Sequence, residues 1–183
     1  MVHQATCISV NDEAAHGIPS PTRHLRAGDL ANLDASAELD GYFSDTGVSV
    51  AVGDVSEAAF RLLEATRQTQ LVAMDSARPG RRLQDIGRAV QSSARARGFR
   101  VIRNLCGHGI GHGLHEWPSV PSIDDGQQTM LSEGLVLAVE PFLSPSAEYV
   151  TEDADGWTLR TADGGPVAQF EHTMGSRLRV HSC

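Results

Sequence analysis

Three histidines in a glycine-rich stretch are the residues of this chain best suited to chemistry. His108, His112 and His115 lie within the segment from Cys106 to Pro118. On an α-helix they would share one face and form a metal site, but the glycines at 107, 109, 111 and 113 disfavour a helix, because each costs about 1 kcal/mol relative to alanine. We therefore expect an extended or looped backbone, which a ligand or another strand can approach closely.

Imidazole is a common metal ligand and a general acid or base near neutral pH, so this stretch is a candidate functional site. The alternative is a glycine-rich loop with surface histidines, which is a common composition for loops. The carboxylates elsewhere in the chain bear on this choice. Glu140 ends an otherwise apolar run that begins at Leu135, and Glu171 lies in a predicted strand beside apolar neighbours. Burying an ionised carboxylate without a partner costs many kcal/mol, so each needs a cation or a proton.

Two more carboxylates lie on the arms of a predicted β-hairpin. Residues 29–39 alternate between apolar and polar types, the Asp40-Gly41 pair favours a tight turn, and residues 42–52 run back as the partner strand. Asp34 belongs to the first arm and Asp45 to the second. The face that carries Asp34 is polar throughout, so a solvated strand residue is also a reasonable interpretation there.

Taken together, four carboxylates and one imidazole lie near strand ends or in a glycine-bordered loop: Asp34, Asp45, His108, Glu140 and Glu171. Hard oxygen ligands with one nitrogen suit two divalent ions of the Mn, Fe(II) or Co kind, with Zn also compatible. Carboxylates that bridge ions about 3.5–4 Å apart form the two-metal arrangement that activates water for hydrolysis. Spacing alone does not exclude five unrelated side chains.

The elements that must position these residues follow from periodicity. We expect strands at 6–11, 29–39, 42–52, 99–104, 135–139, 157–161, 167–173 and 178–181, and loops at 12–21 and 119–128. Amphipathic helices are predicted from Asp54 to Met74, with Asp54 or Ser56 as the N-cap, and from Leu83 to Arg97, closed by Gly98. An acidic, disordered-looking turn is expected at 144–155. This order indicates an α+β fold, an antiparallel sheet with helices on one face.

Length and composition limit the remaining possibilities. The 183 residues, with 40% hydrophobic content, suit a single domain over 1–183. The net charge is −8 and all 15 basic residues are Arg with no basic run, which argues against nucleic acid as a direct partner. The three cysteines show no C-x-x-C spacing and predict a reducing, cytoplasmic setting. No window reaches the roughly 18 apolar residues of a membrane span.

These residues resemble the type I methionine aminopeptidases, a metallopeptidase family with the pita-bread fold. Any one matching motif is weak, but the series runs in family order with family-like separations from about residue 7 to residue 173. The matching stretches lie at 7–11, 16–19, 32–34, 40–42, 45–46, 106–111, 115–116, 140–141, 155–158 and 168–173.

The resemblance implies a role for each matching residue. The metal ligands would be Asp34, Asp45, His108, Glu140 and Glu171, with Asp45 and Glu171 bridging two ions. Glu140 would also shuttle the proton of the attacking water. His16 would hydrogen-bond the scissile peptide, and His115 would stabilise the oxygen that becomes negative. The implied substrate is the N-terminal Met of a new polypeptide with a small second residue, so an association with ribosomes also fits.

The chain departs from the family pattern in two respects. It lacks N-terminal residues that normally contribute a helix and part of the methionine pocket, and the rest of that pocket would be Cys7, Leu105, Leu114 and Trp157. Leu105 and Leu114 replace residues that are usually aromatic. Missing helices would leave an apolar patch and an open sheet edge, which favours pairing with a partner or with another copy.

Three functional readings follow from this resemblance. The first is an active metallo-aminopeptidase, supported by the presence of all the implied ligands and of both auxiliary histidines. The second is a truncated paralogue, weakly active or inactive, that serves as a binding or regulatory module or has an altered specificity. The third is an X-Pro peptidase of the same fold, which the motifs at 16–19 and 157–158 disfavour.

Overall fold

The computed structural model describes residues 6–176. Within them, one antiparallel sheet runs in the order β1-β3-β4-β12-β8-β6-β7, with β9 attached to β12 and β5 to β9. The strands of this sheet are β1 (Thr6–Val10), β3 (Leu30–Leu39), β4 (Tyr42–Ala51), β5 (Arg100–Val101), β6 (Cys106–Gly109), β7 (Glu116–Pro121), β8 (Val136–Val139), β9 (Phe142–Ser144) and β12 (Ala168–Gly175). A small second sheet contains β2 (Glu13–Ala15), β10 (Val150–Glu152) and β11 (Leu159–Thr161).

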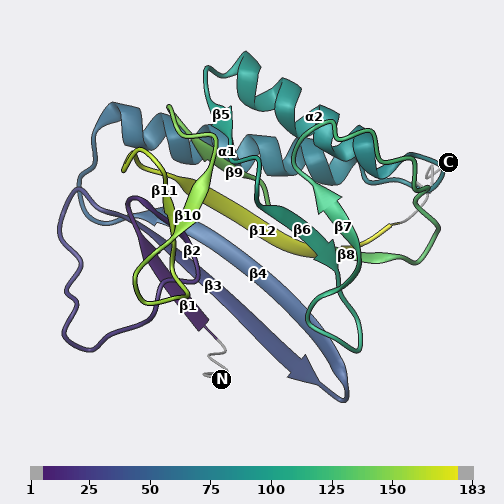
Figure 1. Cartoon of the computed structure of the whole chain (residues 1–183), viewed down its shortest axis with the longest axis horizontal. Coiled ribbons are helices and arrows are strands. Elements are labelled where there is room, and N and C mark those ends of the chain that lie inside the picture. The colour runs from purple at the N-terminus through teal and green to yellow at the C-terminus, as the bar shows by residue number, and fades with distance from the viewer. Residues whose placement is uncertain (1–5, 177–183) are drawn as a thin grey trace, which may run out of the picture.

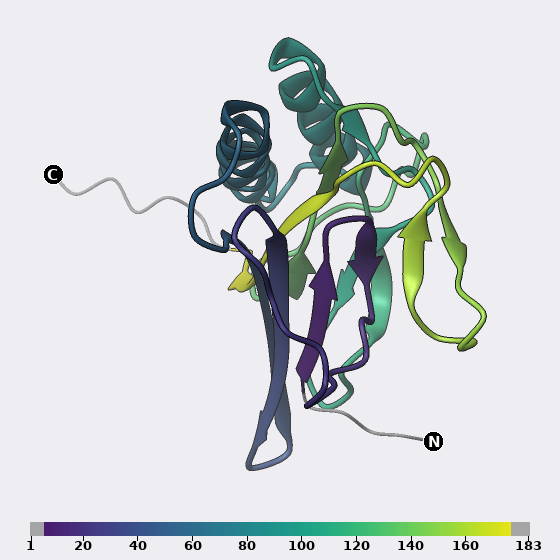
Figure 2. The ribbon, with the colours of Figure 1, turned by 90° about the vertical axis from the view of Figure 1, so that its left-hand side faces the viewer.

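Two helices, α1 (Glu57–Ser76) and α2 (Leu83–Ala96), pack together on the same side of the large sheet (Figures 1 and 2). The main core between helices and sheet includes Leu62, Ile86, Leu137 and Leu143, each completely buried. The α+β arrangement predicted from the sequence is therefore confirmed.

The helix boundaries agree closely with the prediction. Ser56 is the N-cap of α1, since its hydroxyl accepts a hydrogen bond from the backbone N–H of Ala59. α2 ends at Ala96, and Gly98 follows with a φ of 82°. A glycine is well suited to that left-handed backbone, which reverses the chain towards β5.

Three predicted loops or turns contain strands instead. Residues 13–15 of the predicted loop 12–21 form β2, because they pair with β11. Residues 119–121 belong to β7, because β7 pairs with β6 from His108↔Ser119 to Cys106↔Pro121. The acidic stretch 144–155 is ordered and includes β10, which pairs with β11. Arg160 on β11 offsets the local negative charge through ion pairs with Asp12, Glu13 and Asp153. The predicted strand at 178–181 lies outside the described residues.

The long β3–β4 hairpin separates polar and apolar side chains by simple alternation. Its register pairs Asn32 with Ser49 and Ser36 with Asp45, so that the polar side chains of both arms share one face. Leu33 and Val48, which pair on the other face, are 40% and 42% exposed. These side chains form part of an exposed apolar surface, as expected from the sequence. That a partner or a second copy covers this surface stays a prediction.

Candidate metal centre

Five neighbouring strands each bring one predicted ligand to a common point. In sheet order the residues come from β3, β4, β12, β8 and β6: Asp34, Asp45, Glu171, Glu140 directly after β8, and His108. They line one cavity of about 360 Å³. Residues that are up to 137 positions apart in the sequence (34 and 171) are therefore gathered by strand pairing alone.

Ligand atoms of these residues form two close groups that share one member. One oxygen each from Asp34, Asp45 and Glu171 lie within 4.8 Å of one another, and so do single ligand atoms of His108, Glu140 and Glu171. Glu171 is only 4% exposed and belongs to both groups. This is the arrangement expected where one carboxylate lies between two cations.

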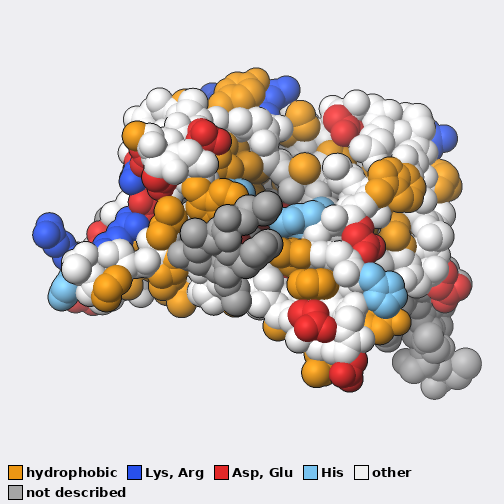
Figure 3. Space-filling view, turned by 60° about the horizontal axis from the view of Figure 1, so that its bottom comes forward, with side chains coloured by type: hydrophobic (Ala, Val, Ile, Leu, Met, Phe, Trp, Pro, Cys, Tyr) orange, Lys and Arg blue, Asp and Glu red, His pale blue; other side chains and the backbone are white. Residues whose placement is uncertain are grey.

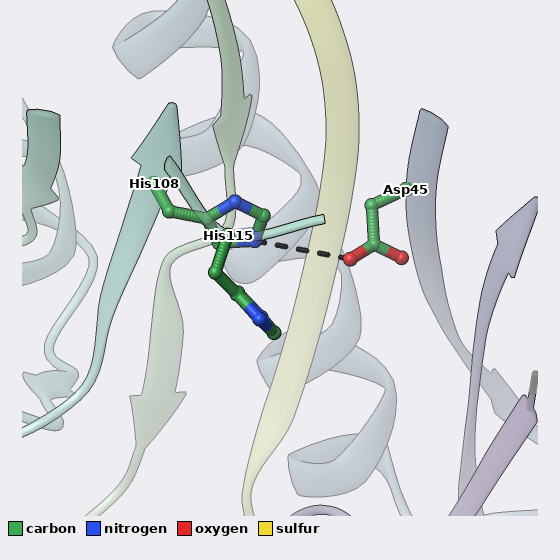
Figure 4. A group of neighbouring side chains, drawn as sticks. All are labelled: Asp45, His108 and His115. Carbon is green, nitrogen blue, oxygen red and sulfur yellow. Dashed lines mark ion pairs between the residues drawn. The ribbon is translucent and has the colours of Figure 1, made fainter. Parts of the chain in front are cut away.

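His108 presents one ring nitrogen to the carboxylates. Its Nδ1 lies 2.9 Å from the carbonyl oxygen of Gly109, which can only accept, so Nδ1 carries the proton. Its Nε2 lies 3.8 Å from Asp45 Oδ2 and 3.6 Å from Glu140 Oε1 (Figure 4 shows the approach to Asp45). A neutral imidazole fixed in this tautomer is a ready nitrogen ligand.

The electrostatics of the cavity call for positive charge. Burial, with added repulsion from Asp45, raises the pKa of Asp34 to about 7. Burial and then Glu140 raise the pKa of Glu171 to about 10, and burial and then Asp34 raise the pKa of Glu140 well above its usual range. Among the described residues that line the cavity, none is an Arg. Divalent cations would supply the missing charge, so the donor set fits a metal pair.

Asp45 is held in place by its neighbours. The carboxylate, in a residue only 5% exposed, accepts a hydrogen bond from Ser36 Oγ at 3.0 Å and one from its neighbouring Thr46 N–H at 3.2 Å. Thr173 on β12 locks the backbone, since its hydroxyl accepts from Asp45 N–H and donates to the Asp45 carbonyl, both at 2.8 Å. The carboxylate is thus preorganised by partners on both adjacent strands.

The two auxiliary histidines lie at the wall of the same cavity. The ring of His115 meets that of His108 edge-on, with 4.4 Å between the ring centroids, and Figure 4 shows the two histidines next to each other, across from Asp45. His16 has a φ of 61° and stacks on Trp157 at 5.1 Å. Burial lowers the pKa of His16, which favours the neutral ring. Figure 3 shows histidine side chains among hydrophobic ones on this face.

His112 does not join His108 and His115. Its Nδ1 lies 2.8 Å from the carbonyl oxygen of Gly41, and its ring lies 4.4 Å from that of Tyr42 at the tip of the long hairpin. The backbone adds a hydrogen bond of 2.7 Å from Phe43 N–H to the Gly111 carbonyl. The loop that carries His115 is therefore fastened to the hairpin.

The predicted substrate pocket is gathered only in part. Leu105 lines the cavity, and Cys7 pairs with Asp34 across β1 and β3. Burial and the nearby carboxylates raise the pKa of the Cys7 thiol to about 11. Leu114 is half-buried and Trp157 is exposed, and neither is among the described residues that line the cavity.

Two of the residues that sequence reasoning missed bear directly on the site. Phe142, which follows Glu140 and Pro141 in the sequence and is 2% exposed, lines the cavity with an apolar ring. Gln169, also 2% exposed, donates hydrogen bonds to Glu140 and Glu171 from within the stretch 168–173 that resembles the family. A polar amide in an apolar stretch of a central strand was the available signal for the second.

Comparisons with known sequences and structures identify the family of this chain. A model of metallopeptidase family M24 matches residues 2–175. Methionine aminopeptidase 2 of Bacillus subtilis is 47% identical over 171 residues, which cover 92% of this chain and 69% of that protein. The crystal structure of methionine aminopeptidase from Thermotoga maritima matches with a TM-score of 0.90 and 37% identity, covering 93% of this chain and 69% of that one. The chain therefore belongs to metallopeptidase family M24.

Within this family, the chain belongs with the methionine aminopeptidases. The prolidase from Pyrococcus horikoshii matches with a TM-score of 0.73 but at 24% identity, and it covers 94% of this chain and 45% of that one, so that likeness shows the fold alone. The predicted pita-bread fold is confirmed by both structures. The use of divalent metal follows from the family together with the ligand groups in the cavity. None of the helices in residues 6–176 is long and apolar enough to cross a membrane.

Proposed function

We propose that this chain is a dinuclear-metal aminopeptidase that removes N-terminal methionine from new polypeptides with a small second residue. The observation that carries the proposal is the pair of ligand groups that share Glu171 on one cavity, with His16 and His115 beside them. The names of the relatives supply the reaction, and the cavity supplies groups for each part of it.

The two groups assign the metal ligands. Asp34, Asp45 and Glu171 would hold one ion, and His108, Glu140 and Glu171 the other. The family resemblance implies that Asp45 would also contribute to both ions, and its Oδ2 lies 3.8 Å from His108 Nε2. Carboxylates with one imidazole are compatible with Mn, Fe(II), Co or Zn. When bound, the ions would polarise the scissile carbonyl and lower the pKa of water.

The chain's own side chains perform the proton transfers and orient the peptide. Glu140 accepts the proton of the attacking water and returns it to the leaving amine. His115 donates a hydrogen bond to the oxygen that becomes negative, and His16 hydrogen-bonds the scissile peptide.

The methionine side chain would lie against Leu105 and Phe142, which line the cavity, with Cys7 near the carboxylates and with Trp157 fixing His16 by stacking. Leu114 is the fourth residue that the family likeness assigns to this pocket. An apolar wall next to a strongly polar floor suits a thioether side chain attached to a peptide.

The cellular setting is a separate part of the proposal. Cys7 and Cys106 are free thiols, which supports a reducing, cytoplasmic location. Ribosome association and a partner or second copy over the apolar surface of the hairpin stay predictions. The large sheet takes strands from β1 to β12, which supports our inference that 1–183 form one catalytic domain. The non-catalytic module is not favoured, because the relatives are named aminopeptidases.

The test is release of methionine from a Met-Ala-Ser peptide by purified protein reconstituted with Mn(II) or Co(II). We expect turnover that is abolished by Glu140→Ala or His108→Ala, and two metal equivalents bound per chain. The matched control is His172→Ala, which removes an exposed histidine next to Glu171. A protein that binds no second equivalent, or that binds both and never releases methionine, contradicts the proposal.

A further inference from the structure

Gln169 contacts the two glutamates of the proposed metal centre without offering them a ligand atom. Its Nε2 donates to Oε2 of Glu140 and to Oε2 of Glu171, both at 3.2 Å. An amide NH₂ has no lone pair to give a cation, so this group cannot itself bind metal. It lies behind the carboxylates and holds one oxygen of each.

The orientation of this amide is fixed by Asn32. The Nδ2 of Asn32 donates to Gln169 Oε1 at 2.8 Å and to Ser49 Oγ at 3.2 Å. Ser49 Oγ in turn accepts from the backbone N–H of Gln169 at 2.9 Å. The reversed amide would point its oxygen at two carboxylates and its NH₂ at another NH₂, so this network admits one orientation.

All three side chains of the network are buried. Gln169, Ser49 and Asn32 are 2%, 4% and 6% exposed, so no solvent replaces a lost hydrogen bond. Gly47 closes the space above Gln169, because a Cβ at this position would lie 2.5 Å from Gln169 Oε1. The amide is thus confined on one side by backbone and on the other by the two carboxylates.

The hydrogen bonds from Gln169 determine which carboxylate oxygens of Glu140 and Glu171 remain available to a cation. With Oε2 of Glu140 held by the amide, its Oε1 is the atom that lies 3.6 Å from His108 Nε2. Glu171 is held through Oε2 in the same way. Ligand oxygens of the two glutamates lie within 4.8 Å of each other, and an NH₂ group that donates to both carboxylates offsets part of their mutual repulsion.

We propose that Gln169, oriented by Asn32, is a positioning residue that holds Glu140 and Glu171 in the geometry that binds the metal pair. This inference rests on the proposed metallopeptidase function and adds a residue that acts on the metal through its ligands. Hydrogen-bonded partners of metal ligands typically account for about 10–100-fold in metal affinity or activity.

The experiment compares Gln169→Met with wild type by calorimetric titration of Mn(II) into the metal-free protein. Methionine keeps the length of the side chain and removes the hydrogen bonds to Glu140 and Glu171 together with the one from Asn32. We expect the dissociation constant to rise by about 10–100-fold, and kcat at saturating metal to fall with KM for Met-Ala-Ser unchanged. The matched control is Gln84→Met, the same change at a buried glutamine on α2 that accepts a hydrogen bond from Gln128, and it should leave the metal affinity unchanged.

Asn32→Leu is the second variant, and it decides the question if Gln169→Met fails to fold. It leaves Gln169 in place but removes the group that orients it, so we expect weaker metal binding with a folded circular dichroism spectrum. In the double variant the two losses should not add, because Asn32 acts through Gln169. Wild-type affinity in both folded single variants overturns the inference. Failure of the wild type itself to bind metal or release methionine overturns the proposed function on which it rests.

Discussion

The glycine at position 47 offers a sharp test of how tightly the site is packed. A Cβ on Gly47 would lie 2.5 Å from Gln169 Oε1 and 3.0 Å from Glu171 Oε2. Real Cβ contacts are not this short, so Gly47→Ala must displace an amide that is held at 2.8 Å by Asn32 and at 3.2 Å by Glu140. The added methyl group would meet a buried amide and a buried carboxylate, and not the end of a flexible, exposed side chain that could move aside.

Overpacking of this kind costs typically about 1–3 kcal/mol of unfolding free energy. For a chain of this length, a loss of about 2 kcal/mol lowers the melting temperature by roughly 4–8 °C. We therefore expect a drop of that size for metal-free Gly47→Ala, measured by circular dichroism. Metal affinity should fall as well, because the displaced amide no longer holds Glu140 and Glu171.

Gly165→Ala is the matched control. Its added methyl would meet the side-chain ends of Asp163 at 3.0 Å and Ser146 at 3.2 Å, and the exposed Asp163 can move aside. The control should melt close to wild type and bind metal normally. If Gly47→Ala behaves like this control, the packing of the amide against β4 is looser than the distances indicate, and the reasoning fails.

Two further predictions concern protons and the loop histidines. The pKa of Asp34 is raised to about 7 and that of Glu171 to about 10, so the folded metal-free chain retains protons that the unfolded chain releases above about pH 4–4.5. Its unfolding free energy should therefore fall as pH rises from about 4.5 towards 7 and beyond, and Asp34→Asn should flatten this slope in thermal melts of chelator-treated protein; a stability that climbs over this range contradicts the assignment. His115→Ala should lower kcat by roughly 10²–10³-fold with metal affinity unchanged, whereas His112→Ala, on the same loop, should lose much less. An equal loss in both variants would indicate a general effect of the loop, and a loss of metal affinity in His115→Ala would make that residue a ligand.

The residue types were sufficient to propose the five ligands, but their spacing was not sufficient to predict that the five side chains meet in one site. Glu140 and Glu171 stood out because an ionised acid in an apolar strand is costly, yet Asp34 on a polar face looked ordinary. Strand pairing between β3, β4 and β12 brings Asp34 beside Glu171, and such pairing depends on contacts across more than a hundred residues. The family likeness, and not the spacing, supplied that connection.

Other features depended on neighbours that periodicity does not reveal. The strand β10 forms in an acidic segment because Arg160 on β11 offsets Asp153 and Asp12. Gln169 gave little warning, since a neutral amide in a strand signals no charge to be matched. Its importance follows from Asn32 and Glu140, which only the folded sheet places around it.

Because side chains alternate between the two faces of β12, the geometry of the metal centre depends on the alignment of this strand. Gln169 and Glu171 both contact the cage, while the residue between them, Phe170, pairs with Val48 on the apolar side of β4. Sliding β12 by a single position would turn Gln169 and Glu171 away and place the Phe170 ring among the three remaining acids, Asp34, Asp45 and Glu140. Cations would therefore bind only to the correctly aligned sheet. Metal that is present during folding would stabilise the correct pairing of β12 over a shifted one.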